Sequence, residues 1–308
     1  MPVSTSVHIS HCLQWIIRLN PASVLDVGCG FGLWGFLCRE YLDVMNERVQ
    51  PASWRVRIDG IELFEPYILA HQKALYTSIQ IADIRDVAPR VDEYDLIITG
   101  DVIEHLDKSE GEAVLETLYG KARKALLVNI PIGGGWDHPE RHGNPGELHR
   151  SQWQVEDFLP YPCEYELFGL PCGQYGAFFC PKEGSQDRRA ECLLTAADRS
   201  LMHGNLPKAV RLAREAFTLD RGKTEVALFL ADALIRTSDV AGAADVLTNA
   251  LAVNPAFHYG YLALARIELA LGRRSEATAR FRALAVMEGV DPEIRSVAEQ
   301  ELAKLGSA

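Results

Sequence analysis

A glycine-rich turn is the first feature of the sequence that could do chemistry. Gly28, Gly30 and Gly32 follow the apolar run Ser23–Val27 at intervals of two residues. Glycine lets the backbone come close to a ligand in conformations that a Cβ forbids, and the N–H groups of a following helix would face that ligand. The turn therefore predicts a small-molecule pocket. Its spacing is not the Gly-x-Gly-x-x-Gly of dinucleotide-binding proteins, and Asp26 offers a carboxylate to an ammonium group, which a pyrophosphate lacks.

A second cluster of chemically capable side chains lies in the segment 136–153, which is rich in Gly, Pro, His and Trp. It is polar for a core and long for a plain connection, and loops at strand ends usually carry substrate contacts. We therefore predict a lid that binds the substrate, with His149 as a general base. The alternative is a surface loop with solvated histidines. The predicted substrate-binding residues are Trp136, His138, His142, Arg150 and Trp153, with the two tryptophans as apolar walls.

His105 is a second candidate base. It follows the apolar run Tyr94–Thr99, and an α/β sheet has its ligand crevice just beyond the ends of its strands. The alternative is that Glu104 and His105 only begin a helix and shape the pocket.

Seven strand-like segments, alternating with helical ones, must position these residues. Helices are expected over Leu33–Val44 and about Ser109–Leu118. The alternation indicates an α/β doubly wound, Rossmann-like, seven-stranded and mostly parallel sheet, and the short turn between the last two strands indicates an antiparallel edge. The predicted strands are Ser23–Val27, Val56–Glu62, Ser78–Ala82, Tyr94–Thr99, Ala125–Ile130, Glu164–Phe168 and Gly176–Cys180.

Charge divides the chain into two parts. Of 308 residues, 42 are Asp or Glu and 31 are Lys or Arg, for a net charge of −11. The whole acidic excess lies in residues 1–183, whereas residues 184–308 are neutral. A boundary is predicted between them, in the polar stretch 181–187.

The acidic balance disfavours nucleic acid as a partner. The seven cysteines are scattered, which predicts reduced thiols and a cytoplasmic location. The sequence shows no apolar run of bilayer length and no basic-then-apolar leader, so no membrane partner is expected.

Residues 184–308 show a period of 34 residues. Small turn residues and alanines recur in register: Gly204, Ser238 and Gly272, followed by Ala209, Ala243 and Ala277. These positions resemble the tetratricopeptide repeat, a stack of helix–turn–helix pairs. The repeats are expected at about 190–223, 224–257 and 258–291, with a cap helix at 292–305. An unrelated all-α helical bundle is the alternative.

The glycine turn also belongs to an ordered set of motifs. The run Asp26-Val-Gly28-Cys-Gly30-Phe-Gly32 looks like motif I of class I S-adenosylmethionine-dependent methyltransferases, and the motifs at Glu62, Asp83-Ile84 and residues 94–106 follow in the family's order. The resemblance covers roughly residues 15–183. It implies S-adenosyl-L-methionine as cofactor, with Glu62 holding the ribose hydroxyls and Asp83 accepting from the adenine amino group. The implied cofactor-binding residues are Asp26, Gly28, Cys29, Gly30, Gly32, Glu62, Leu63, Asp83, Ile84 and Asp101.

Two features depart from that pattern or extend it. Asp26 and Glu62 are 36 residues apart, more than the ~20 of a compact βαβ unit, which indicates a loop insertion at 46–54. Asp101, Glu104 and His105 also resemble the spacing in metal-dependent methyltransferases that act on small-RNA 3′ ends. One of three histidines could complete such a set: His138, His142 or His149. Because mixed carboxylate and imidazole ligands suit Mg²⁺ or Mn²⁺ only moderately, no metal is expected.

The sequence thus predicts a methyltransferase that acts on an oxygen or nitrogen of a small metabolite or glycan. A protein or peptide acceptor recruited by the repeats is the first alternative, since such repeats present a concave surface. A scaffold without catalysis is the second. The repeats could equally bind a protein partner or a second copy of the chain.

Overall fold

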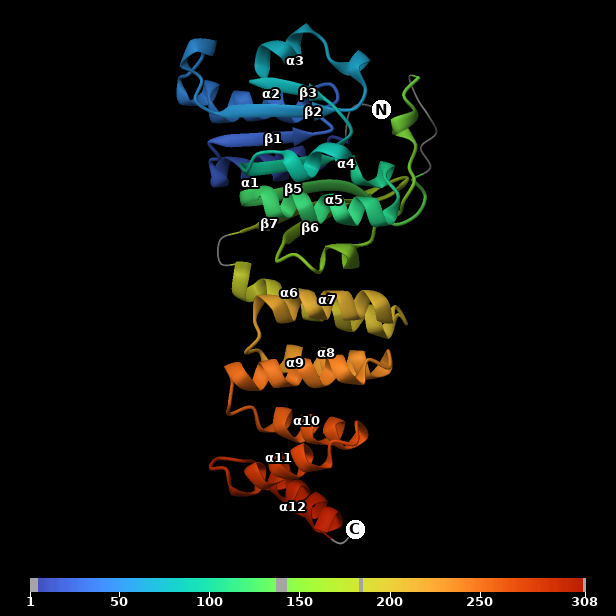
Figure 1. The fold of residues 1–308 in the computed structure, drawn as a ribbon. Coiled ribbons are helices and arrows are strands. Elements are labelled where there is room, and N and C mark those ends of the chain that lie inside the picture. The colour runs from blue at the N-terminus through green and yellow to red at the C-terminus, as the bar shows by residue number, and fades with distance from the viewer. Residues whose placement is uncertain (1–4, 137–142, 183–184, 307–308) are drawn as a thin grey trace. The chain divides into compact units, whose positions relative to one another are not determined.

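The structure, a computed structural model, describes residues 5–136, 143–182 and 185–306. The chain forms two compact units, Met1–Ser185 and Gln186–Ala308. The strands lie in the first unit, whereas the described part of the second unit is helical (Figure 1).

The first unit is built on a seven-stranded sheet of order β3-β2-β1-β4-β5-β7-β6. Strands β1 to β5 run parallel, and β7 lies antiparallel between β5 and β6. The predicted doubly wound sheet with an antiparallel edge is confirmed. The strands are β1 Ser23–Val27, β2 Arg57–Glu62, β3 Ser78–Ile81, β4 Tyr94–Gly100, β5 Ala122–Ile132, β6 Glu164–Leu170 and β7 Gly173–Pro181.

The parallel strands end at a common edge. Val27, the last residue of β1, lies opposite Ile61 of β2 and Thr99 of β4, and Ile81 of β3 pairs with Glu62. The segments that follow these four strands therefore meet at one place, which is where an open α/β sheet holds its ligand.

Helices cover both faces of the sheet, because successive strand residues point to opposite sides. Leu25 and Ile97 pack in one apolar core with residues of α5, whereas Val24 and Leu96 pack in another with residues of α1 and α2. The helices of this unit are α1 Ile9–Leu19, α2 Leu33–Leu42, α3 Ala70–Leu75, α4 Ile84–Val87 and α5 Lys108–Lys121.

The insertion between β1 and β2 is anchored by one buried carboxylate. Asp43 accepts hydrogen bonds from the side chains of Arg39 and Arg48 and from the backbone N–H of Arg55. α2 ends at Leu42, two residues before the predicted end.

The second unit contains only helices within its described residues. These helices are α6 Ser185–Met202, α7 Leu206–Leu219, α8 Thr224–Arg236, α9 Val240–Val253, α10 His258–Ala270, α11 Arg274–Val286 and α12 Pro292–Gly306. From α7 to α12, each helix packs against the next.

The 34-residue period has a clear physical origin. Gly204, Ser238 and Gly272 all have positive φ, at 75°, 64° and 76°, because each turns the chain between the helices of a pair. The alanines five residues later, exemplified by Ala209 and Ala243, are fully buried where the two helices approach closely. Across the described parts of both units, no helix has the length and apolar character needed to cross a membrane.

Candidate functional site

A pocket of about 290 Å³ lies at the common edge where the parallel strands end. It receives side chains from the segments after β1, β2, β3 and β4. Eight of the ten residues predicted to bind the cofactor line it: Gly28, Cys29, Gly30, Glu62, Leu63, Asp83, Ile84 and Asp101. We call it the first pocket.

The glycine turn is folded onto the end of β2. The N–H groups of Gly28 and Cys29 donate to the carbonyl of Ile61 over 2.8 and 3.1 Å, and the N–H of Gly30 donates to Oε2 of Glu62 over 2.9 Å. Gly28 has φ +67°, and a Cβ there would lie 2.3 Å from Cγ2 of Val102. The glycine is required both by its conformation and by the close approach of the segment after β4.

Glu62 is buried, with 6% of its surface exposed, and still borders the first pocket. Its Oε1 accepts from the N–H of Phe64 over 2.9 Å, opposite the bond from Gly30. Burial raises the pKa of this carboxyl above its ordinary value. Because a carboxylate oxygen can accept more than one hydrogen bond, Glu62 keeps the capacity to accept from ligand hydroxyls.

Asp83 is already engaged by a guanidinium. It pairs with Arg85 at 2.6 Å, and Arg85 also reaches Glu110 at 3.1 Å. The hydrogen bond from Arg85 holds the pKa of Asp83 below its usual range. Arg85 itself lines the first pocket and was not predicted from the sequence, since nothing in the motif marks it.

Asp26 and Gly32 do not line the first pocket. Asp26 is 1% exposed, and its Oδ2 accepts from the hydroxyl of Tyr76 over 2.5 Å and from the N–H of Gly35 over 3.2 Å. Burial raises the pKa of Asp26 to about 7. Gly32, with φ +85°, precedes the first residue of α2. This corrects the expectation that Asp26 faces the ligand: its carboxylate positions the turn instead.

Asp101 has an unusual backbone for a residue with a side chain. Its φ is +53°, a conformation that costs about 1–3 kcal/mol and persists only where the surrounding structure imposes it. The hydroxyl of Tyr175, on β7, donates to its Oδ1 over 2.8 Å. That bond fixes the side chain at the wall of the first pocket.

Part of the predicted lid covers the first pocket. Asn144, Pro145, Gly146 and Glu147 line it, and the hydroxyl of Tyr67 donates to Oε1 of Glu147 over 3.0 Å. Tyr67 also lines the first pocket and was not predicted from the sequence, because its contact with Glu147 joins positions 80 residues apart.

A second pocket, of about 140 Å³, adjoins the first. The two share Arg150 as a lining residue. The second pocket is lined by Glu104, Pro131, Gly133, Trp136, His149, Arg150, Ser151 and Gln152. Three residues predicted for substrate or catalysis are thus brought together: Trp136, His149 and Arg150.

Trp153 is not a wall of either pocket. It is fully buried, packs against Phe158, and its indole N–H donates to Oγ of Ser151 over 3.0 Å. The expectation of a second apolar wall is corrected, because this ring belongs to the core under the lid. His138 and His142 lie outside the described residues.

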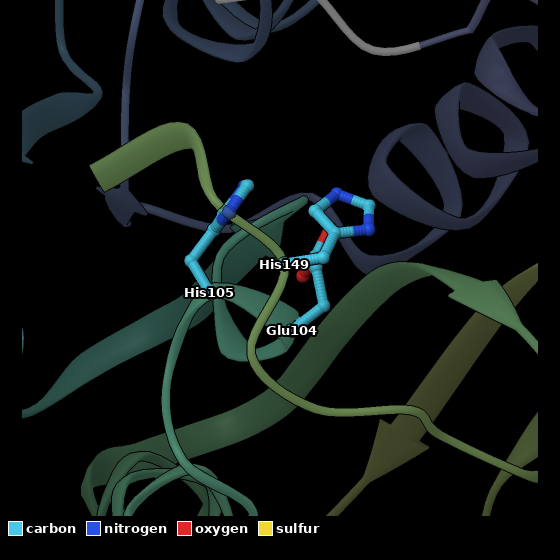
Figure 2. A group of neighbouring side chains, drawn as sticks. All are labelled: Glu104, His105 and His149. Carbon is cyan, nitrogen blue, oxygen red and sulfur yellow. The ribbon is translucent and has the colours of Figure 1, made fainter. Parts of the chain in front are cut away.

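The two candidate bases lie side by side. The ring centroids of His105 and His149 are 4.9 Å apart, although the residues come from different segments, one after β4 and one from the lid (Figure 2). The N–H groups of Arg150 and Ser151 donate to the carbonyl of Glu104 over 2.8 and 3.0 Å, which holds the lid against the end of β4. The role of either histidine as a base stays a prediction.

Glu104 completes the cluster. One ligand atom from each of Glu104, His105 and His149 lies within 4.8 Å of the other two. Glu104 is 1% exposed, and its two carboxylate oxygens have no hydrogen-bond partner among the described residues. Burial, with the negative charge of Asp101, raises the pKa of Glu104 well above its ordinary value. Such a group either keeps its proton or binds a cation.

Comparisons with known proteins find no matching family model and no matching curated protein. Similar folds occur among solved structures. One is magnesium protoporphyrin IX methyltransferase (ChlM) from Synechocystis PCC 6803 with bound SAH, at 18% identity and a TM-score of 0.40, covering 56% of this chain and 81% of that one. Another is a SAM dependent methyltransferase from Archaeoglobus fulgidus, at 15% identity and a TM-score of 0.42, covering 56% of this chain and 93% of that one.

For the helical unit, the first TPR domain of the human RPAP3 protein is similar at 20% identity and a TM-score of 0.32, covering 38% of this chain and 90% of that one. At these TM-scores the likenesses carry no weight in the functional assignment, which rests on the pockets themselves.

Proposed function

We propose that the first unit is an S-adenosylmethionine-dependent methyltransferase that binds its cofactor in the first pocket. One observation carries this proposal. The ends of four parallel strands bring to one wall the residue types of the four ordered motifs, namely Cys29 in the glycine turn, Glu62, Asp83 and Asp101. In this proposal the glycine turn approaches the methionine moiety, Glu62 accepts from the ribose and the segment at Asp83 contacts the adenine.

The charge of the first pocket favours a cationic ligand over a pyrophosphate. Four carboxylates line it, from Glu62, Asp83, Asp101 and Glu147, against two guanidinium groups. One of these, on Arg85, is already paired with Asp83 and Glu110. The sulfonium and ammonium groups of S-adenosylmethionine would be attracted by such a wall, whereas a dinucleotide would bring two more negative charges to it.

The second pocket supplies the acceptor side of the reaction. Trp136 offers an apolar surface, and Arg150 offers a cation that borders both pockets. Since the sulfonium methyl is already electrophilic, the protein's main task is to align an oxygen or nitrogen of the acceptor with the S–CH₃ bond. Alignment alone can contribute ~7–11 kcal/mol. The modest size of the second pocket, about 140 Å³, favours a small metabolite or the end of a glycan.

Transfer of a labelled methyl group tests this proposal. The full chain is incubated with cell extract and methyl-labelled S-adenosylmethionine, and small molecules are separated from macromolecules. Label that depends on the chain and appears among small molecules or glycans supports the proposed acceptor class. Label in proteins supports the alternative, a peptide acceptor recruited by the helical repeats. If the chain binds the cofactor but labels neither fraction, the result supports a scaffold without catalysis and contradicts the enzyme.

A further inference from the structure

The cluster of Glu104, His105 and His149 has the composition of a metal site. Its ligand atoms lie within 4.8 Å of one another, one carboxylate oxygen and two imidazole nitrogens (Figure 2). Two histidines and one glutamate are an established set for zinc sites that keep a coordination position open. Imidazole also suits other divalent transition-metal cations.

The carboxylate of Glu104 is the second observation that points to a cation. Both of its oxygens are buried without a hydrogen-bond partner among the described residues, although only 1% of the residue is exposed. Buried carboxylates are normally paired, hydrogen-bonded or bound to a metal, because leaving one unsatisfied is costly. The unsatisfied carboxylate of Glu104 lies beside the imidazole nitrogens of His105 and His149, with which it could share a cation.

The hydrogen bond of His105 prepares its other nitrogen for a cation. Nδ1 lies 3.2 Å from the carbonyl oxygen of Leu148. A carbonyl can only accept, so Nδ1 carries the proton in this contact and Nε2 of the neutral ring carries the lone pair. Metal-binding histidines are commonly oriented in this way, by a backbone carbonyl on the far nitrogen.

The cluster is also accessible from both pockets. His105 lines the first pocket, His149 lines the second, and both rings are half-buried. With no further ligand from the described residues, a cation held by these three side chains would keep open positions toward the space where cofactor and acceptor meet. Three protein ligands with open positions are typical of catalytic rather than structural metal sites.

We propose that Glu104, His105 and His149 bind one divalent transition-metal cation, Zn²⁺ or Mn²⁺, at the boundary of the two pockets. Ligand atoms lie roughly 2.0–2.2 Å from zinc, so small side-chain rotations draw the three groups together on binding. Both imidazoles are then ligands, and neither acts as the predicted general base. The proposal departs from the expectation of no metal, and it holds independently of the proposed methyl transfer.

Binding of Mn²⁺ alone tests the site. The full chain is stripped with chelator and titrated with Mn²⁺, followed by electron paramagnetic resonance, in which bound Mn²⁺ loses the signal of the free ion. One Mn²⁺ per chain is expected, displaced by Zn²⁺ in accordance with the usual affinity order. Glu104→Gln and His149→Ala should each weaken binding at least ~10-fold. His203→Ala, which removes an exposed histidine from the helical unit, should leave it unchanged.

Absence of Mn²⁺ uptake by the wild-type chain overturns the proposal, as does uptake that both variants retain. Glu104→Gln removes a buried carboxylate and should fold. Its Mn²⁺ binding therefore tests the site even if His149→Ala does not fold. The same samples are titrated with S-adenosylmethionine. Glu104 does not line the first pocket, so Glu104→Gln should bind the cofactor like the wild type. Mn²⁺ uptake without cofactor binding would overturn the methyltransferase proposal alone.

Discussion

The hydroxyl of Tyr76 donates a hydrogen bond to Oδ2 of Asp26 over 2.5 Å, and both side chains are buried. The same hydroxyl accepts from the N–H of Gly35 over 3.1 Å. The ring also lies where a side chain at Gly35 would be, since a Cβ there would come within 2.1 Å of it. Tyr76 therefore joins the end of β1 to the beginning of α2, on either side of the glycine turn.

Removing the Tyr76 hydroxyl should destabilise the first unit. Tyr76→Phe leaves the buried carboxylate of Asp26 without that donor, which costs about 1–3 kcal/mol of unfolding free energy. Denaturant unfolding at neutral pH measures the loss. Tyr165→Phe, on a tyrosine that is 48% exposed, is the control and should change stability by less than about 0.5 kcal/mol. Equal effects of the two substitutions would contradict the role given to Tyr76.

Asp26 should make stability depend on pH. Its pKa is raised by burial to about 7 in the folded chain, from an ordinary value of 3.8. The folded state therefore binds this proton more tightly than the unfolded state, and the stabilisation by protonation is lost as pH rises from about 4 to 7. Relative to Asp26→Asn, the wild type should lose up to about 1.4 kcal/mol per pH unit in that window. A difference between the two proteins that stays constant from pH 4 to 8 would refute this.

A methyl group on the glycine turn should be poorly tolerated. Gly28→Ala combines φ +67° with a Cβ 2.3 Å from Val102, so it should cost more than about 1 kcal/mol. Gly120→Ala is the matched control: no atom lies within 4 Å of its Cβ, and it sits in α5, where alanine should stabilise by roughly 0.5–1 kcal/mol. Thermal unfolding of both variants gives the comparison. If the two substitutions shift stability in the same direction, Gly28 is not required by its conformation and its contact with Val102.

The two lid tryptophans should behave differently. Trp153→Ala creates a cavity in the core and should cost about 3–5 kcal/mol, since Trp153 is fully buried. Trp136→Ala, at the half-buried wall of the second pocket, should cost about 1 kcal/mol or less. Similar losses of unfolding free energy in chemical denaturation would contradict the assignment of Trp153 to the core and Trp136 to the pocket wall.

The sheet and the first pocket were predictable because their signals are local. Strand patterns and the glycine turn each lie within a few residues, and the strand order of an α/β sheet then brings Glu62 and Asp101 to the same edge. The helical repeats were predictable for another reason. Their turns must adopt positive φ at a fixed interval, which Gly204 and Gly272 reveal.

Contacts between distant segments could not be predicted in this way. The partner of Asp26 is Tyr76, 50 residues further along, and no pattern links them. Trp136 and Trp153 are the same residue type in the same lid, and only packing decides which is core. The meeting of His149 with Glu104 and His105 likewise depends on how the lid folds back, through the backbone bonds to the carbonyl of Glu104.

Calorimetric titration of the full chain with S-adenosylmethionine shows directly whether the first pocket binds this cofactor. One molecule is expected to bind per wild-type chain. Glu62→Gln should bind it at least ~10-fold more weakly, about 1.4 kcal/mol, because an amide nitrogen cannot accept from the N–H of Gly30 or Phe64. Glu65→Gln, an exposed neighbour that does not line the pocket, should bind like the wild type. A wild-type chain that binds no cofactor, or a Glu62→Gln variant that binds it as tightly, would rule out the first pocket as the cofactor site.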